Sequence, residues 1–112
     1  MNKNRTIVVT GGSSGIGAAT CRMFFEKGDH VISLDNKPSD NYVRTSISCD
    51  LSDPKSIDSA IQKLDTDAID VLLNIAGVPG TFEPLKIMEV NVLGLQYLTE
   101  KLIDKIKIDG AI

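Results

Sequence analysis

The sequence is poor in the residues that mark disulfide-rich and metal-binding proteins. Its 112 residues include two cysteines and one histidine. Two cysteines are too few for a disulfide framework, so we expect Cys21 and Cys49 to be reduced, buried thiols in a cytoplasmic protein, with a bridge between them as the alternative. His30 has no cluster of ligating residues near it in the sequence. We therefore predict no metal site and place His30 at the solvated entry of a strand.

Long apolar runs and an excess of positive charge are also missing. The first apolar run, Ile7 to Val9, is too short for the core of a signal peptide, and we expect no membrane-spanning segment. The formal net charge is −3 and the lysines are scattered, so we expect no nucleic-acid partner. The length corresponds to one domain, which we assign to residues 1–112.

What the sequence does contain is an alternation of short β-branched runs and helical patterns. The runs predict strands over 7–10, 31–34, 44–49 and 69–73, helices over 15–27, 54–64 and 85–106, loops over 36–41 and 78–84, and the start of a fifth strand over 110–112. This order is typical of an α/β fold with a Rossmann-like, doubly wound parallel sheet.

Caps and apolar spacing locate the helices more closely. Asp53 and Pro54 suit the start of the second helix, and Gly28 suits a left-handed end for the first. Residues at helical spacing are expected to face the core: Ile16, Ala19, Met23 and Phe24 in the first helix, Ile57, Ala60, Ile61 and Leu64 in the second, and Leu85, Met88, Val92, Leu95, Thr99, Leu102 and Ile106 in the third.

A run of small residues over 10–17 joins the first strand to the first helix. We expect Gly11 to allow a sharp exit from the strand, Gly15 to let a pyrophosphate approach the backbone, and Gly17 to let the helix pack on the sheet. The free N–H groups of a helix that begins here would attract an anion. The spacing differs from the G-x-G-x-x-G pattern but serves the same purpose, so it predicts a dinucleotide site.

The form T-G-x-x-x-G-I-G over 10–17 resembles the cofactor loop of the short-chain dehydrogenase/reductase family. Three further stretches match family elements in the same order: Asp50-Leu51, Asn74-Ile75-Ala76-Gly77 (with Ile75 in place of an asparagine) and Asn91. The resemblance implies that Asp50-Leu51 contacts adenine and that Asn91 is the catalytic asparagine, which shapes a kink in the long helix and orders a water. The alternatives are a turn carboxylate at Asp50 and an asparagine that satisfies backbone groups at Asn91.

Asp35, at the end of the second strand, bears on the choice of cofactor. Its carboxylate can accept hydrogen bonds from an adenosine ribose and repel a 2′-phosphate, unless it is only a solvated turn residue. The resemblance implies that members preferring NADP carry a basic residue in the glycine loop or just after this position. Neither Ser14 nor Asn36 is basic, so we predict NAD rather than NADP, although Lys37 favours NADP. The predicted cofactor-binding residues are Gly11, Ser13, Ser14, Gly15, Ile16, Gly17, Asp35, Asn36, Asp50, Leu51, Asn74, Ala76 and Gly77.

The family's proton transfer uses a serine, a tyrosine and a lysine four residues after the tyrosine. Tyr97 and Lys101 have this spacing, but they follow Asn91 on one helix, whereas the family's pair lies on the next helix, so we assign them no catalytic role. We expect the front half of an NAD-dependent oxidoreductase that transfers a hydride between nicotinamide and a secondary alcohol or ketone, inactive by itself. The alternative is a non-catalytic nucleotide-binding module or pseudoenzyme.

We also expect a homo-oligomer. The fourth strand would be an unprotected edge, which favours pairing with another chain. The family's long helix commonly packs on its counterpart in a second subunit. The residues expected at that contact lie off the main apolar stripe: Ile87, Val90, Leu93, Gly94 and Tyr97.

Overall fold

The computed structural model describes residues 4–37, 39, 41–78 and 81–112, and the expected loop residues Pro38, Asp40, Pro79 and Gly80 lie outside that part. The described residues form one parallel sheet with the strand order β3-β2-β1-β4-β5. The strands are β1 (Thr6–Thr10), β2 (His30–Asp35), β3 (Thr45–Ser48), β4 (Ile69–Asn74) and β5 (Ile106–Ala111). This Rossmann-like arrangement confirms the predicted fold class.

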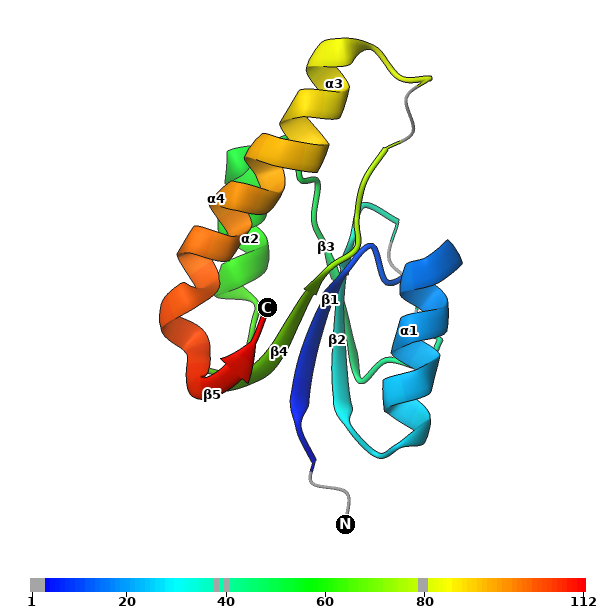
Figure 1. The fold of residues 1–112 in the computed structure, drawn as a ribbon, viewed down its shortest axis with the longest axis vertical. Helices are drawn as coiled ribbons and strands as arrows, with labels where there is room; N and C mark the ends of the chain where they lie inside the picture. Colours follow the sequence, from blue (N-terminus) through cyan, green and yellow to red (C-terminus); the bar gives the residue numbers. More distant parts are fainter. Residues whose placement is uncertain (1–3, 38, 40, 79–80) are drawn as a thin grey trace.

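Helices cover both faces of the sheet (Figure 1). One face carries α1 (Gly15–Glu26). The other carries α2 (Pro54–Gln62) and a long helical segment made of α3 (Pro84–Met88), the π-helical η1 (Glu89–Gly94) and α4 (Leu95–Leu102). In the described part of the chain, no helix has the length and apolarity needed to cross a lipid bilayer.

The alternation of side chains along β1 divides the core into two clusters. Val8 belongs to the cluster beneath α2 and α4, whereas Ile7 and Val9 belong to the cluster beneath α1. All three side chains are completely buried. Because successive residues of a strand point to opposite faces, a continuous β-branched run is what a strand covered on both sides requires.

The predicted helix signals at α1 and α2 are confirmed. The side chain of Asp53 accepts a hydrogen bond from the N–H of Lys55 at 3.0 Å, and Pro54 is the first residue of α2. Gly28 follows the end of α1 with φ of +89°, a left-handed conformation that favours glycine. Cys21 and Cys49 are both buried and unbridged.

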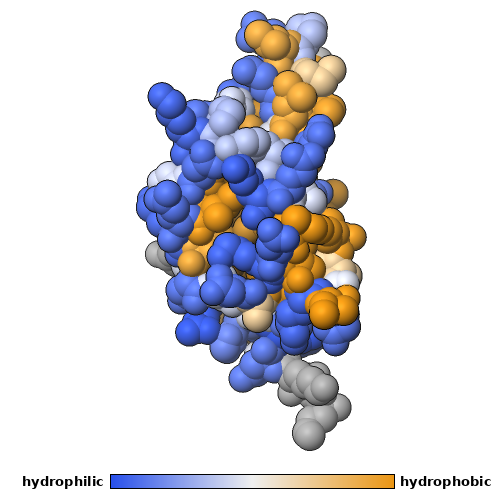
Figure 2. All heavy atoms as spheres, turned by 90° about the vertical axis from the view of Figure 1, so that its left-hand side faces the viewer, coloured by the Kyte–Doolittle hydropathy of each residue, from blue (hydrophilic) through white to orange (hydrophobic). Residues whose placement is uncertain are grey.

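The predicted apolar stripes of the first and third helices are wrong in several positions. Ile16 and Met23 are exposed on α1, which instead buries Gly17 and Cys21. On the long segment, Leu85, Met88 and Val92 are 65%, 49% and 49% exposed, and apolar atoms are visible on this side of the molecule (Figure 2). The segment buries residues four apart: Val90, Gly94, Leu98 and Leu102.

Two features explain this difference in the long helix. A π-helical stretch turns each residue by less than an α-helix does, so the α-helical period does not hold through η1. Gly94 lies so close to the backbone of Leu51 that a β-carbon on Gly94 would overlap the carbonyl oxygen of Leu51. A glycine has no apolar side chain to count, so the pattern missed the position of closest approach. Val90 and Gly94 are buried within the chain, so their assignment to a subunit contact is also wrong.

The end of the chain also differs from the expectation. The long helix ends at Leu102, and a short 3-10 turn, η2 (Ile103–Lys105), leads into β5, which begins at Ile106 rather than Gly110. β5 pairs with β4 in parallel, with an irregular register between Ile69 and Val71. The expectation that the fourth strand is an unprotected edge is therefore wrong.

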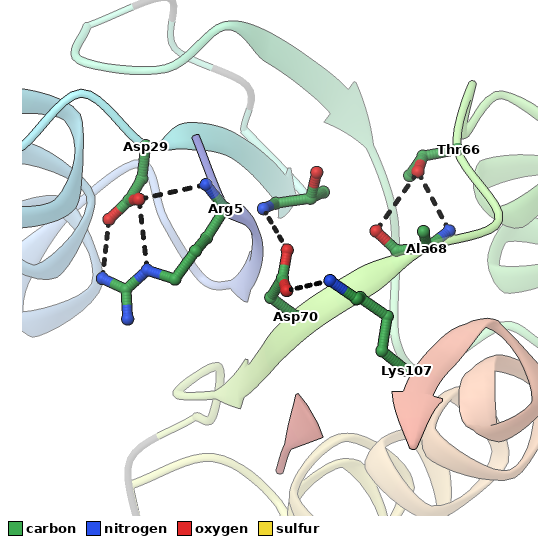
Figure 3. A network of polar contacts seen from close by, with 7 residues as sticks. Arg5, Asp29, Thr66, Ala68, Asp70 and Lys107 are labelled. Atoms are coloured by element: carbon green, nitrogen blue, oxygen red, sulfur yellow. Dashed lines mark hydrogen bonds and ion pairs between the residues drawn. The ribbon is translucent and has the colours of Figure 1, made fainter. Parts of the chain in front are cut away.

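A network of polar contacts links the strands at their amino-terminal ends (Figure 3). Asp29 is buried and accepts three hydrogen bonds from Arg5, one from its backbone N–H and two from its guanidinium group. Asp70 on β4 accepts from the N–H of Thr6 at 2.8 Å and from the ammonium of Lys107 at 2.9 Å. Since Thr6 is on β1 and Lys107 on β5, Asp70 links three adjacent strands at the end opposite the predicted site.

Candidate functional site

A cleft of about 500 Å³ lies at the carboxyl ends of the strands, where a doubly wound sheet binds its ligands. The strand order reverses between β1 and β4, because β1 pairs with β2 on one side and with β4 on the other. The predicted cofactor residues that line the cleft are Gly11, Ser14, Ile16, Gly17, Asp35, Asn36, Asp50, Leu51, Ala76 and Gly77. Ser13, Gly15 and Asn74 do not line it, and Ser13 faces a separate hollow beside Arg22.

The glycine loop is held in shape by close backbone contacts. Gly11 has φ of +72°, and a β-carbon on it would lie 2.8 Å from the Cα of Ala76. Gly17 approaches the carbonyl oxygen of Gly11 within the loop, rather than the sheet as predicted. Gly12, which was assigned no role, makes the contact with Ser33 on β2 and Cys21 on α1. The loop therefore tolerates no side chain at Gly11, Gly12 or Gly17 in this conformation.

The first turn of α1 borders the cleft through Ile16 and Gly17, and its first residue is uncrowded. Gly15 has φ of +57°, and nothing within 4 Å would meet a β-carbon on it. Within the described part of the chain, Ser14 at the N-cap makes no side-chain capping bond, and the first turn of α1 holds no acidic residue. The first N–H groups of the helix thus lack a side-chain acceptor, which is the condition for binding an anion there.

Asp35 is oriented by two backbone groups at the edge of the cleft. Its Oδ2 accepts from the N–H of Ser13 at 3.1 Å, and its Oδ1 accepts from the N–H of Lys37 at 2.8 Å. It thus ties the glycine loop to the chain after β2. Each carboxylate oxygen can accept more than one hydrogen bond, so both retain capacity for a ligand hydroxyl.

Asp50 is organised by the turn that precedes α2. Its Oδ1 accepts from the backbone N–H of Ser52 at 2.9 Å and from the Ser52 hydroxyl at 2.7 Å. These hydrogen bonds hold the pKa of the Asp50 carboxyl below its usual value, against the opposing effect of burial. Oδ1 therefore accepts hydrogen bonds within the turn, as expected of the turn carboxylate that was the alternative for Asp50. The adjacent Leu51 is buried and lines the cleft.

Thr10, at the end of β1, was not predicted as a site residue. Its hydroxyl is buried, accepts from the N–H groups of Ile75 and Ala76 at 3.0 and 3.1 Å, and is 3.4 Å from the carbonyl oxygen of Leu73, to which it can donate. It thereby joins β1 to the segment after β4 at the point where the strand order reverses. A hydroxyl residue directly between an apolar strand and a glycine turn is the sequence signal for this role.

The side chains of Asn74 and Asn91 do not line the cleft, and their amides bond to other residues of the protein. Asn74 donates to the Thr99 hydroxyl on α4 at 3.0 Å. Asn91 lies inside η1; its Oδ1 accepts from the N–H of Val78 at 2.8 Å, and its Nδ2 donates to the Val78 carbonyl at 3.1 Å. A β-carbon on Gly77 would lie 3.2 Å from that Oδ1. Asn91 thus sits at an irregularity of the helix and braces the wall of the cleft.

Tyr97 and Lys101 lie outside the cleft. The Tyr97 hydroxyl donates to Asp58 on α2 at 2.8 Å, and this hydrogen bond raises the pKa of the tyrosine. The Lys101 ammonium lies 5.4 Å from the centre of the Tyr97 ring. A tyrosine that transfers protons needs a lowered pKa, so this environment agrees with assigning the pair no catalytic role.

Several cleft residues were not predicted: Leu34, Lys37, Cys49, Ile75, Val78, Phe82, Lys86 and Val90. Burial raises the pKa of the Cys49 thiol to about 11, so this cysteine is a neutral apolar wall residue. Lys86, Val90 and Gly94 are spaced by four residues along the long helix. That spacing, with its glycine, is the signal that could have identified the face of the helix turned toward the site.

Comparison with known proteins agrees with this geometry. The family model described as short chain dehydrogenase matches residues 5–112. A coniferyl-alcohol dehydrogenase of Pseudomonas sp. is 47% identical over 109 residues, which cover 97% of this chain and 42% of that protein. This chain therefore spans less than half the length of that relative.

Solved structures of similar fold are also about twice as long as this chain or longer. The crystal structure of a short chain dehydrogenase family protein from Francisella tularensis superposes with a TM-score of 0.82 at 22% identity, covering 96% of this chain and 49% of that chain. A 3-ketoacyl-(acyl-carrier-protein) reductase from Brucella melitensis, solved with NADH, gives 0.73 at 25% identity, covering 90% and 50%. With the family match across residues 5–112, these findings establish that the chain belongs to the short-chain dehydrogenase family.

Proposed function

We propose that this chain is the cofactor-binding half of an NAD-dependent oxidoreductase, which transfers a hydride between nicotinamide and a secondary alcohol or ketone. The observation that carries the proposal is the cleft itself, where the open first turn of α1, Asp35 and Asp50 meet at the reversal of strand order. The related dehydrogenase of Pseudomonas sp. is named for an alcohol, which supports an alcohol as the substrate, although the alcohol in that name is a primary one. The bound nicotinamide would supply the redox chemistry.

The residues present fit a dinucleotide. The pyrophosphate is assigned to the first turn of α1, where Gly15 leaves open space and N–H groups lack side-chain acceptors. Asp35 is assigned to the adenosine ribose, and Asp50 with Leu51 to the adenine. Asn91 is assigned a supporting role, because its amide holds Val78 in the wall of the cleft.

The choice of NAD over NADP depends on Asp35. Solved relatives contain NADH in one case and NADP in another, so family membership leaves the choice to local residues. A carboxylate at the end of β2 repels a 2′-phosphate, whereas Lys37 beside it would attract one. We assign the dominant effect to Asp35, because its hydrogen bonds to Ser13 and Lys37 fix it next to the glycine loop.

Calorimetry with NAD and NADP tests this proposal. We expect NAD to bind at least tenfold more tightly than NADP, and Asp35→Ala to weaken NAD binding and reduce the preference. Asp65→Ala, an exposed change of the same kind outside the cleft, is the control. Equal binding of the two cofactors would contradict the predicted NAD preference, and no effect of Asp35→Ala would contradict the role of this residue.

For the chain by itself we propose binding without turnover. Among the described residues, the tyrosine and lysine with the family's spacing contact Asp58 and each other rather than the cleft. The proton-transfer groups are therefore assigned to a longer form of the protein, which we place in the cytoplasm as a homo-oligomer. Formation of NADH by the 112-residue chain in the presence of an alcohol would refute this part of the proposal.

A further inference from the structure

Three polar residues from two segments, the loop after β3 and the helix α3, form a connected series of hydrogen bonds at one end of the cleft. The Lys86 ammonium on α3 donates to the Ser52 hydroxyl at 2.8 Å. The Ser52 hydroxyl donates to Asp50 Oδ1 at 2.7 Å, and the backbone N–H of Ser52 donates to the same oxygen at 2.9 Å. Lys86 and Asp50 both line the cleft. These hydrogen bonds therefore connect the long helix to the loop after β3 in the wall of the proposed site.

This arrangement leaves one oxygen of Asp50 without a hydrogen bond from the described residues. Oδ1 already accepts two hydrogen bonds from Ser52, whereas no donor in the described part of the chain bonds to Oδ2. The backbone on the other side is fixed as well, because the N–H of Asp50 donates to the Ser56 hydroxyl at 2.8 Å. Asp50 is thus held with one oxygen occupied and the other available as an acceptor.

We infer that Lys86 is a positioning residue for recognition of the adenine amino group, acting on Asp50 through Ser52. The inference rests on the proposed function, which places the adenine at Asp50 and Leu51. The Ser52 hydroxyl has one hydrogen to donate, and a lysine ammonium is a donor only. While Lys86 donates to Ser52, that hydroxyl accepts from the lysine and gives its own hydrogen to Oδ1, which leaves Oδ2 for the exocyclic amine of the base.

The position of Lys86 distinguishes it from a surface lysine. Its side chain is half-buried, and its contact joins residues that are 34 positions apart in the sequence. Lys55, on the first turn of α2, lies close in sequence to Ser52 but is exposed and does not line the cleft. The two lysines carry the same charge near the same loop, so comparing them separates the specific contact from a general effect of charge.

The test compares NAD with nicotinamide hypoxanthine dinucleotide, which has a carbonyl oxygen in place of the adenine amine. We expect the unmodified chain to bind NAD about tenfold or more tightly than the analogue, because the analogue leaves a charged acceptor without its donor. Lys86→Met is expected to reduce this ratio to about threefold or less. Lys86→Arg, which keeps a donor, should restore most of the ratio, and Lys55→Met should leave it unchanged.

A purely structural role would give a different pattern. If Lys86 only stabilised the helix, Lys86→Met would weaken both ligands equally and leave their ratio intact, and that result would overturn the inference. Ser52→Ala removes the hydroxyl that joins Lys86 to Asp50, so it should reduce the ratio of the two affinities as Lys86→Met does. An unchanged ratio in this variant would also overturn the inference. Failure of the unmodified chain to bind NAD would instead refute the proposed function, which distinguishes the two failures.

Discussion

Replacing Thr10 with valine removes the polar connection between β1 and the segment after β4 while keeping the side chain's shape. The Thr10 hydroxyl is completely buried and accepts from two backbone N–H groups, those of Ile75 and Ala76. Valine has no acceptor, so both N–H groups would lose their protein partner in a part-buried region beside the cleft. The substitution thus isolates the hydrogen bonds from the packing around them.

The magnitude follows from those two donors. A buried donor left without a partner costs about 1–3 kcal/mol, and the added methyl group recovers part of this through its apolar contacts. We therefore expect the free energy of unfolding to fall by about 3 kcal/mol. With a urea dependence of about 1.5 kcal/mol per molar, the midpoint would shift downward by about 2 M.

Urea denaturation followed by circular dichroism measures this shift, and calorimetry measures the expected loss of NAD affinity. Thr20→Val is the matched control: the Thr20 hydroxyl donates to the carbonyl of Ile16 one turn earlier on α1, and among the described residues it bonds to no other element. Its cost should stay below about 0.5 kcal/mol. If Thr10→Val unfolded at the same urea concentration as the parent chain, the proposed role of this hydroxyl would be wrong.

Two further predictions concern the opposite end of the sheet and the long helix. The guanidinium of Arg5 lowers the pKa of the Asp29 carboxyl, so the pair stabilises the fold fully above the unfolded-state pKa of about 3.9 and loses this effect as pH falls through the lower folded-state value. Acid titration of unfolding should show a smaller loss of stability below about pH 4 in Asp29→Asn than in the parent, and equal slopes would refute it. Gly94→Ala should lower the free energy of unfolding by about 1–3 kcal/mol, because the new methyl would overlap the Leu51 carbonyl oxygen. Denaturant unfolding against the exposed control Gln96→Ala tests this, and an equal effect of the two would contradict the close contact.

The parts of the fold that could be predicted are those whose cause is local. Ile7 to Val9 indicate a buried strand because their own side chains require cover on both faces. Asp53 and Pro54 start a helix through bonds within one turn, and Gly28 ends one through its own backbone conformation. None of these features depends on which distant segment packs against it.

The errors occur where a distant segment decides. The buried face of the long helix is set by the approach of Gly94 to Leu51 and by the π-helical turn, not by where the large apolar side chains lie. Leu85, Met88 and Val92 have the spacing of a core stripe but remain exposed in this chain. Likewise, the strand that begins at Ile106 continues the helical spacing of apolar residues, and only its pairing with β4 distinguishes it from a further helical turn.

In the candidate site, too, the identity of a residue could be predicted while its contact with a distant segment could not. Family resemblance could single out Asn91, but not its contact with Val78, because that contact depends on how the π-helical turn packs against the loop after β4. Thr10 holds residues 75 and 76 of this loop, and Asn91 holds residue 78. The wall of the cleft is therefore shaped by two side chains that bond to its backbone. A loss of cofactor affinity on replacing either one would arise from displacement of this wall, even though neither side chain is among the residues that line the cleft.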